Sequence, residues 1–290
     1  MRCVVVGGGA WGSAFTHLLR ENGHDVLVAH RDTLDSAPYE EADLVVLAVP
    51  SSSFRDVLGR VRGEAPILSL TKGLDPESGE RLSTLVAGRP VAVLSGPNMA
   101  EEVVAGLPGA TVIASKDEAL LARLQEAVNS LVFRVYVNDD VAGVELCGAA
   151  KNVIALAAGA VDGLALGDNA KAALITRGLV EMARLGEAAG ASPETFSGLA
   201  GMGDLMVTCF HPSGRNRRAG ELIALGATPD EAKAQIGQVV EGLTTAPVLR
   251  DLSHRIGVEL PITEGVCAVL EGMPLRDLAE SLMGRRPSRE

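Results

Sequence analysis

The stretch that decides the fold is RCVVVGGGAWG, residues 2–12. Its first part, Cys3 to Val6, is a short apolar run rich in valine that stops at Gly7, as a buried strand does. A helical pattern follows, because apolar residues recur on one face between positions 11 and 19, and Gly23 is typical of a residue just beyond a helix end. The chain therefore begins with a strand, a tight glycine turn and a helix.

The glycines of this turn, Gly7, Gly9 and Gly12, fit the pattern G-x-G-x-x-G. Between a strand and a helix, this pattern is typical of a site that binds the pyrophosphate of a dinucleotide. The first glycine permits the tight turn, the second lets the backbone approach the pyrophosphate, and the third allows close packing of helix on strand. The free N–H groups at the helix N-terminus favour the same anion. A glycine-rich turn without a ligand is the alternative, which this context disfavours.

The end of the second predicted strand, Asp25 to Ala29, bears on the choice of cofactor. A site that prefers NAD usually places an acidic residue about 20 residues after the glycines, bound to the ribose 2′-hydroxyl. His30 and Arg31 stand here instead, and a guanidinium pairs well with a 2′-phosphate, so we expect both residues at a site for NADP(H). Two alternatives stay open: Asp32 can reach the ribose of NAD(H), and Arg31 can be a solvated loop charge.

Strands and helices alternate through the first half of the chain. Further strands are predicted at Leu44 to Val49, Ile67 to Leu70, Val91 to Leu94, Thr111 to Ala114 and Phe133 to Val137, with helices over 52–62 and 117–130. Continuous apolar strands of this kind predict an α/β, Rossmann-like, doubly wound parallel sheet covered by helices on both faces. Between the second and third strands, residues 30–43 leave room for at most one short helix.

Helical patterns dominate from Val141 onward. Helices are predicted over 143–164, 169–189, 214–225, 229–236 and 245–256. Ser192 and Thr228 each precede a proline and are predicted to cap a helix with their hydroxyls. We therefore expect a dinucleotide-binding domain over residues 1–138 and an all-α substrate and catalytic domain over 139–290. The tail after Gly284 has the composition of a disordered segment.

The composition limits the class of protein. The chain has 290 residues, of which 47% are hydrophobic and only 3% aromatic, so the core must be mainly aliphatic. Its 26 Lys and Arg against 37 Asp and Glu give a net charge of −11, which argues against binding of nucleic acid. A small anionic ligand remains compatible with that charge, because a pocket can be basic on an acidic protein.

The remaining composition signals concern metals, redox state and membranes. The cysteines Cys3, Cys147, Cys209 and Cys267 are scattered and the histidines show no ligand spacing, so neither a metal site nor a disulfide framework is predicted. Reduced thiols fit the cytoplasm best. We see no signal-peptide pattern, and the longest apolar run, Val153 to Val161, is shorter than the roughly 20 residues of a membrane span.

Lys151 is the first candidate for catalysis. It lies in the otherwise apolar helical stretch VELCGAAKNVIALAA, residues 144–158, with Asn152 beside it. A lysine there is expected to be buried, and burial lowers the pKa of a lysine toward a value that suits proton transfer at neutral pH. A structural lysine bonded to the adjoining domain is the alternative.

Two segments further along are candidates for substrate binding. In FSGLAGMGDLMVTCF, residues 196–210, three glycines would let Asp204 approach a ligand closely, although an aspartate that forms a turn or caps a helix is common. The next segment, SGRNRR at 213–218, places arginines and Asn216 at the start of a helix, which suits a phosphate group. A solvated basic helix start is the alternative.

Lys72 follows the fourth predicted strand, and Gly96 and Asn98 follow the fifth. Open α/β sheets bind their ligands beyond the carboxyl ends of the strands. We therefore expect a functional role for Lys72 and for the backbone around Gly96.

Taken together, these motifs resemble those of bacterial NAD(P)-dependent glycerol-3-phosphate dehydrogenases over nearly the whole chain. The matching stretches are GGGAWGSAF, ADLVVLAVPS, SLTKGL, LSGPNMAEEV, ELCGAAKNVIALAAG, GDNAKAALITRG, FSGLAGMGDLMVTC, GRNRRAG, VVEGLTT and ELPITEGV. The resemblance implies reversible reduction of dihydroxyacetone phosphate to sn-glycerol 3-phosphate, which supplies the backbone for phospholipid synthesis. It also implies a homodimer.

The resemblance also implies roles for single residues. Lys151 would be the catalytic acid/base. The implied substrate contacts are Lys72, Gly96, Asn98, Lys151, Asp204, Gly214, Arg215 and Asn216. The implied cofactor contacts, beside Gly7, Gly9 and Gly12, are Ala10, Trp11, His30, Arg31, Lys72, Ala100, Arg215, Val239 and Glu241.

Three positions depart from the family pattern. The segment between the second and third strands is shorter than usual, which affects contacts to the adenosine side of the cofactor. Gly214 stands where serine is frequent and offers only its backbone, while Asn98 replaces a threonine or serine and keeps a polar contact. A different two-domain dehydrogenase for hydroxy or keto acids, and a non-catalytic NADPH sensor, are the competing hypotheses. The sensor hypothesis leaves Lys151 and Asp204 without a role.

Overall fold

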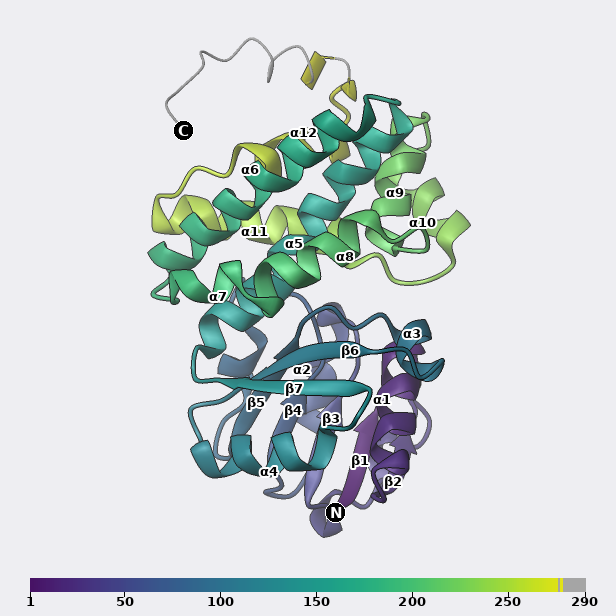
Figure 1. The fold of residues 1–290 in the computed structure, drawn as a ribbon, viewed down its shortest axis with the longest axis vertical. Helices are drawn as coiled ribbons and strands as arrows, with labels where there is room; N and C mark the ends of the chain where they lie inside the picture. The colour runs from purple at the N-terminus through teal and green to yellow at the C-terminus, as the bar shows by residue number, and fades with distance from the viewer. Residues whose placement is uncertain (276, 279–290) are drawn as a thin grey trace.

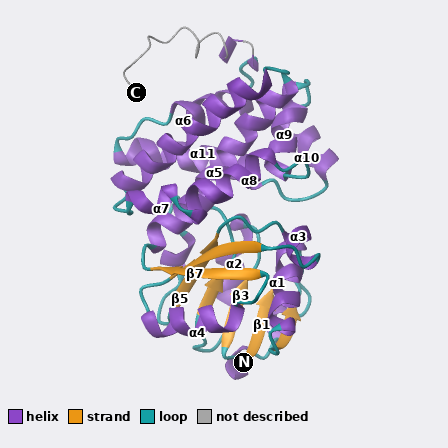
Figure 2. Ribbon diagram, in the orientation of Figure 1, coloured by secondary structure: helices purple, strands orange, loops and turns teal. Residues whose placement is uncertain are grey.

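The computed structural model describes residues 1–275, 277 and 278. A sheet half at the N-terminus and a helical half stack along the long axis of the molecule (Figure 1). All strands lie in the first of these, and the second is built from helices (Figure 2). The predicted disordered tail after Gly284 lies outside the described residues.

The sheet has seven strands in the order β2-β1-β3-β4-β5-β6-β7. Their bounds are β1 Arg2–Val6, β2 Asp25–Ala29, β3 Leu44–Leu47, β4 Ile67–Ser69, β5 Val91–Ser95, β6 Gly109–Ala114 and β7 Phe133–Asn138. Each was predicted to within two residues. The inner strands β1 and β3 are almost wholly buried, and separate apolar clusters cover the two faces of the sheet, as expected for a doubly wound fold.

One strand pair departs from the predicted parallel sheet. β6 runs antiparallel to β5, with Leu94 opposite Ile113, whereas all other neighbours are parallel. The connection between them holds only the short helix α3, Ala100–Val104. A parallel return needs a crossover helix that spans the sheet, and five helical residues are too few, so the chain turns back on itself.

The other helices of the sheet half are α1 Ala10–Glu21, α2 Ser51–Arg60 and α4 Glu118–Val128. Between β2 and β3, where one short helix at most was expected, the chain forms two 3₁₀ turns, Leu34–Ser36 and Tyr39–Glu41. Pro38 separates the turns, because proline donates no N–H to continue a helix. The buried Tyr39 hydroxyl donates to the Leu34 carbonyl at 2.8 Å and fixes the two turns together.

The helical half is organised around α5, Val141–Gly163, which is buried along most of its length. The other helices are α6 Gly167–Ala188, α7 Pro193–Ser197, α8 Asp204–Phe210, α9 Arg215–Ala224, α10 Pro229–Ile236, α11 Glu241–Ile256 and α12 Pro261–Leu270, with a π-helical turn over Leu199–Gly203. α3, α8 and α12 were not predicted. A Cβ at Gly220 of α9 would lie 1.9 Å from the Leu156 carbonyl oxygen, so glycine allows α9 to pack directly on α5.

The two predicted caps differ in outcome. Thr228 forms a complete capping box with Glu231 at the start of α10, which confirms the prediction. The prediction for Ser192 is wrong, because its hydroxyl donates to Glu194 Oε2 at 2.5 Å and makes no cap bond to the backbone of α7.

Helix α5 is long and apolar enough to cross a membrane by composition alone. In this structure 83% of its apolar window is buried inside the protein. Its surroundings are therefore those of the core helix of a folded domain.

Candidate functional site

The glycine turn after β1 has a geometry that requires its sequence. Gly7 has φ +106°, and a Cβ there would lie 2.4 Å from the Ala48 carbonyl oxygen. A Cβ at Gly12 would lie 2.0 Å from the Gly7 carbonyl oxygen, because α1 packs directly on the turn. At Gly9 a Cβ would meet no atom within 4 Å. The backbone at Gly9 is therefore open to a ligand, beside the unpartnered N–H groups that begin α1.

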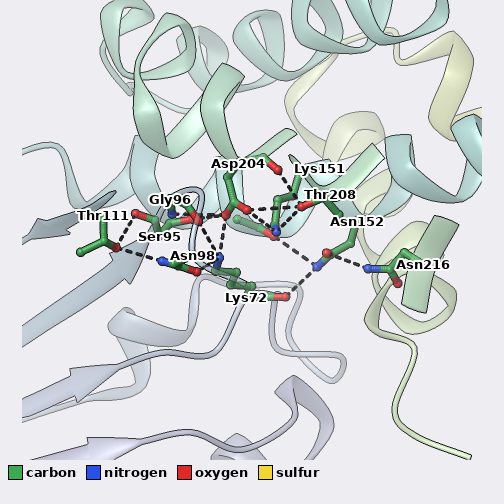
Figure 3. Close-up of polar contacts among 11 residues, drawn as sticks. Lys72, Ser95, Gly96, Asn98, Thr111, Lys151, Asn152, Asp204, Thr208 and Asn216 are labelled. Atoms are coloured by element: carbon green, nitrogen blue, oxygen red, sulfur yellow. Dashed lines mark hydrogen bonds and ion pairs between the residues drawn. The ribbon is translucent and has the colours of Figure 1, made fainter. Parts of the chain in front are cut away.

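Three charged side chains meet between the two halves (Figure 3). Lys151 Nζ donates to Asp204 Oδ1 at 2.7 Å, and Lys72 Nζ donates to Asp204 Oδ2 at 2.7 Å. Lys72 comes from the loop after β4, Lys151 from the middle of α5, and Asp204 is the first residue of α8. Asp204 is 1% exposed and Lys151 is 5% exposed. One buried carboxylate thus joins a lysine from each half, and we call these three residues the lysine cluster.

Further hydrogen bonds fix the Asp204 side of the lysine cluster. Asp204 Oδ2 also accepts from the Ser95 hydroxyl at 3.0 Å and from the Gly96 N–H at 3.2 Å. Lys151 Nζ also donates to Thr208 Oγ1 at 2.8 Å. The end of β5 and the first turn of α8 therefore supply the polar lining around this carboxylate.

Lys72 has its own set of partners. Its ammonium donates to Asn98 Oδ1 at 3.1 Å and to the Gly96 carbonyl oxygen at 3.3 Å. The Asn98 amide in turn donates to the Thr111 hydroxyl at 3.0 Å. Asn98 is buried, so the orientation of its side chain is set by these bonds.

Burial and the neighbouring charges shift the pKa values of two residues of the lysine cluster. Burial lowers the pKa of Lys72 to about 8, against the attraction of Asp204. Burial alone would raise the pKa of Asp204, but the charges of Lys151 and Lys72 outweigh it and lower that pKa to about 2. With both lysines protonated, the cluster carries one net positive charge. A buried positive site of this kind stabilises an anionic substrate and the negative charge that develops on a reacting oxygen.

A run of side-chain amides links the lysine cluster to the N-terminal start of α9. Asn152 donates to the Lys72 carbonyl oxygen at 3.0 Å and accepts from the Asn216 amide at 2.9 Å. Asn216 Oδ1 accepts from the Gly242 N–H at 2.9 Å. Gly214 is the N-cap of α9, so its backbone and Asn216 lie together at that helix start.

The arginines of the same helix separate into two environments. Arg215 is exposed, and its guanidinium donates to the Val239 carbonyl oxygen at 2.9 Å. Arg217 pairs with Asp162 at 2.6 Å and with Glu221 at 3.2 Å. The expectation that the arginines of this segment act together on a phosphate is therefore wrong for Arg217, whose charge is already compensated inside the helical half.

A second contact between the halves involves Glu241, the first residue of α11. Its carboxylate accepts from the Ser51 N–H at 3.2 Å and from the Ser51 hydroxyl at 2.6 Å, at the N-terminus of α2. Burial raises the pKa of Glu241.

Ala100 begins α3, and the indole Nε1 of Trp11 is buried without a partner among the described residues. Such an unsatisfied donor can donate a hydrogen bond to an acceptor atom of a ligand.

His30 and Arg31 lie exposed at the end of β2, with Asp32 next to them. The His30 ring covers Gly8, where a Cβ would lie 2.3 Å from its Cε1 atom. Within the part of the chain that is described, neither residue bonds to the lysine cluster.

Several polar residues of the site were missed by the sequence interpretation, namely Ser51, Ser95, Thr111 and Thr208. Thr208 follows Asp204 by four residues, and this helical spacing could have indicated that both side chains reach Lys151. Ser95 directly precedes Gly96 at the end of a predicted strand. For Ser51 and Thr111 the sequence carries no signal, because their partners lie 190 and 13 residues away.

Two protein-family models match the chain. The model for the C-terminus of NAD-dependent glycerol-3-phosphate dehydrogenase matches residues 140–280, and the model for the N-terminus of the same family matches residues 33–121. The two matches fall in the helical half and in the sheet half, respectively.

Similar proteins agree with these models. The glycerol-3-phosphate dehydrogenase (NAD(P)+) of Salmonella paratyphi B is 41% identical, over 99% of this chain and 96% of that protein. That alignment spans 326 positions against 290 residues here, so the relative has residues that this chain lacks. The crystal structure of glycerol-3-phosphate dehydrogenase from Coxiella burnetii superposes with a TM-score of 0.92 at 36% identity, over 98% of this chain and 99% of that one.

More distant structures share the fold alone. A ketopantoate reductase of the PanE/ApbA family from Ralstonia eutropha JMP134 has a TM-score of 0.56 at 17% identity, over 98% of this chain and 100% of that one. At this identity the likeness carries no argument about substrate.

Proposed function

The chain belongs to the NAD-dependent glycerol-3-phosphate dehydrogenase family, and from that premise we infer that it reduces dihydroxyacetone phosphate to sn-glycerol 3-phosphate with NADPH or NADH. The reaction is reversible and supplies the glycerol phosphate backbone for phospholipid synthesis. The lysine cluster carries this inference within the structure, because a ketone that accepts a hydride needs a positioned proton donor beside its oxygen.

Lys151 is the proposed acid/base. When bound, the reduced nicotinamide supplies the hydride that the C2 carbonyl carbon accepts. The Lys151 ammonium donates a hydrogen bond to the carbonyl oxygen, transfers its proton to that oxygen as the alcohol forms, and is left as an amine. In the reverse direction the amine accepts the same proton. Asp204 and Thr208 accept two of the three N–H bonds of the Lys151 ammonium, at 2.7 and 2.8 Å, which leaves one N–H for the substrate carbonyl.

Lys72 and Asp204 set the net charge of the proposed active site. Asp204 separates two ammonium groups that would otherwise repel, and the net positive charge that remains stabilises the oxygen as negative charge develops on it. We assign Lys72, Gly96 and Asn98 to the substrate, because they form one hydrogen-bonded group next to Asp204.

The phosphate of the substrate is assigned to the start of α9. Asn216 lies in its first turn, Gly214 offers its backbone at the N-cap, and the exposed Arg215 supplies a cation. The positive end of the helix dipole favours a phosphate at this place. Arg217 has no part in this assignment, since Asp162 already holds it.

The cofactor fits the open side of the glycine turn. The uncovered backbone at Gly9, the free N–H groups that begin α1 and the unpartnered Trp11 indole suit a dinucleotide. We assign cofactor contacts to Gly7, Gly9, Ala10, Trp11, Gly12, His30, Arg31, Lys72, Ala100, Arg215, Val239 and Glu241. Arg31 is exposed and so is available to a 2′-phosphate, which supports a preference for NADP(H).

We further propose the assembly and location of the protein. The boundary between a dinucleotide-binding domain, 1–138, and a helical catalytic domain, 139–290, is supported by the end of β7 at Asn138 and the start of α5 at Val141. A homodimer is supported by exposed apolar side chains, Met202 in the π-helical turn and Met206 and Phe210 in α8. A cytoplasmic location is supported by four cysteines that are all unpaired.

The first experiment follows the absorbance of reduced nicotinamide at neutral pH, with dihydroxyacetone phosphate and either NADPH or NADH. We expect oxidation with both cofactors and faster oxidation with NADPH. A parallel panel of hydroxy and keto acids without phosphate should give no turnover. Folded protein that binds NADPH but oxidises it with none of these substrates would contradict the proposed reaction, and turnover of an unphosphorylated acid alone would favour another dehydrogenase.

A further inference from the structure

Lys72 is carried by a segment that lies between the two halves. The segment, which we call the arm, comprises residues 71–85: it leaves β4 and ends in the 3₁₀ turn Leu82–Leu85. Its two limbs pair through an antiparallel bridge between Leu74 and Arg81. Leu74 packs in the apolar core of the helical half, whereas Leu82 packs in the core of the sheet half. The position of Lys72 therefore depends on how both limbs of the arm are held.

One face of α5 supports the first limb. Glu145, Gly148 and Asn152 are spaced by three and four residues and so share a helical face. The Asn152 amide donates to the Lys72 carbonyl oxygen at 3.0 Å. A Cβ at Gly148 would lie 3.4 Å from Lys72 Cγ, so the aliphatic stem of this lysine rests directly on the helix. The limb that carries Lys72 is thus fixed at its backbone and along its side chain.

Glu145 holds the second limb on the same face. Its Oε1 accepts from the Ser83 N–H at 2.8 Å, and its Oε2 accepts from Arg81 Nη1 at 3.1 Å and from the Ser83 hydroxyl. Glu145 is 7% exposed, so these bonds form away from water. A cavity of about 570 Å³ opens beside Arg81 and Ser83. The second limb is therefore held by the packing of Leu82 in the sheet half and, next to this cavity, by the bonds from Glu145.

We propose that Glu145 is a positioning residue for the reduction, which fixes the second limb of the arm against α5 and so keeps Lys72 bonded to Asp204. The assignment rests on the proposed function, because it gives Lys72 a place in that reaction. Glu145 touches neither substrate nor cofactor and acts through Arg81 and Ser83. The charged groups that face Lys72 are Asp204 and Lys151, and the one that faces Glu145 is Arg81.

Glu145→Gln tests this role, because it keeps the shape of the side chain but removes its charge and one acceptor. We expect kcat/KM to fall roughly 10- to 100-fold, as a misplaced binding group does. We also expect the alkaline limb of the pH profile to move to higher pH. Lys72 has a pKa of about 8 because it is buried, and a loosened arm lets water reach it.

Glu181→Gln is the matched control. Glu181 is also a buried glutamate, 6% exposed, and it also accepts backbone N–H bonds, from Ile262 at 2.5 Å and Thr263 at 3.4 Å. It lies in α6 and contacts no residue of the arm through a hydrogen bond that the structure describes. We expect this variant to lose stability without a shift of the alkaline limb, and hydrogen exchange over residues 71–85 to rise in Glu145→Gln alone.

Each outcome bears on the proposal. Folded Glu145→Gln with the kcat/KM and pH profile of the parent overturns it, as does an equal loss in both variants without a shift of the limb. If the parent enzyme oxidises no NAD(P)H with dihydroxyacetone phosphate, the proposed function fails. Hydrogen exchange of the arm in Glu145→Gln still tests whether Glu145 fixes the second limb against α5. If Glu145→Gln does not fold, Arg81→Gln, at a side chain that is 31% exposed, removes one of the bonds between Glu145 and the second limb and must shift the alkaline limb in the same direction.

Discussion

Replacing Asp204 by Asn removes the carboxylate that faces both Lys72 and Lys151 at 2.7 Å. The amide has nearly the same shape and can still accept one hydrogen bond, so the change is mainly one of charge. Two ammonium groups are then left together in a buried place. Loss of one partner of a buried ion pair costs ~3–5 kcal/mol, and we expect about 3 kcal/mol here because one acceptor remains.

The same substitution changes the pH dependence in a defined direction. Asp204 raises the pKa of Lys72 against the larger effect of burial, which brings it to about 8. Without that charge the pKa of Lys72 falls below 8, and its ammonium loses its proton near neutral pH. Asp204 also orients the Lys151 ammonium, so its loss should lower kcat ~10²–10⁴-fold, the range for a positioned acid/base, while the lower pKa of Lys72 moves the alkaline limb of kcat against pH to lower pH.

The assay is steady-state oxidation of NADPH across the neutral and alkaline range, together with urea unfolding. Asp162→Asn is the control, because Asp162 also bridges two cations, Lys171 at 2.8 Å and Arg217 at 2.6 Å, within the helical half. It should cost stability and leave the alkaline limb in place. An Asp204→Asn enzyme with the parental alkaline limb, or a kcat within a factor of about two of the parent, would refute the assigned roles of the lysine cluster.

Three further predictions concern the glycine turn, the cofactor and the stability curve. Gly12→Ala should lower the melting temperature and abolish NADPH binding, because its Cβ would lie 2.0 Å from the Gly7 carbonyl oxygen. Gly9→Ala places its Cβ in open space, so this variant should keep the melting temperature of the parent but bind NADPH more weakly, as measured by titration of Trp11 fluorescence. Arg31→Ser should raise the KM for NADPH roughly 10-fold and leave that for NADH nearly unchanged, since a charge-assisted bond contributes ~1.5–3 kcal/mol; equal effects on both would contradict a 2′-phosphate contact. Between pH 8 and 10.5 the unfolded chain binds the Lys72 proton that the folded chain has lost, so Lys72 contributes a rise in the free energy of unfolding with pH, whereas the buried cysteines, whose pKa burial raises, contribute a fall above pH 9. The difference in unfolding free energy between the parent and Lys72→Met, measured in urea, isolates the Lys72 contribution and should rise with pH across that window; a difference that falls would contradict the lowered pKa.

The sheet half was predictable because its signals are local. Valine and leucine runs mark the strands, and the glycine pattern marks the turn before α1. The antiparallel β6 was not predictable in this way, since its direction follows from the length of the α3 connection and not from its own residues. α12 was missed because Leu260, the residue before its first proline, has no capping side chain, whereas Thr228 marks the start of α10.

In the candidate site, too, residues marked by local sequence could be predicted, and contacts that depend on tertiary packing could not. Lys151 could be found because a lysine in an apolar helix has no polar face to occupy, and it is indeed buried. Asp204 stood out by its glycine-rich setting. That Lys72 shares Asp204 with Lys151 depends on tertiary packing across 132 residues of sequence, which no local pattern encodes. The same holds for Arg217, whose pairing with Asp162 spans 55 residues and compensates its charge within the helical half.

The arm has a consequence for recombining this enzyme with its relatives. By sequence it belongs to the sheet half, yet Leu74 packs in the core of the helical half and Glu145 of α5 holds Arg81 and Ser83. A chimera joined between β7 and α5 would therefore inherit an arm from one parent and its supporting helix face from the other. We expect a functional hybrid to need residues 71–85 and α5 from the same parent. Such a hybrid exchanges two separate segments of the chain and cannot be made with a single junction.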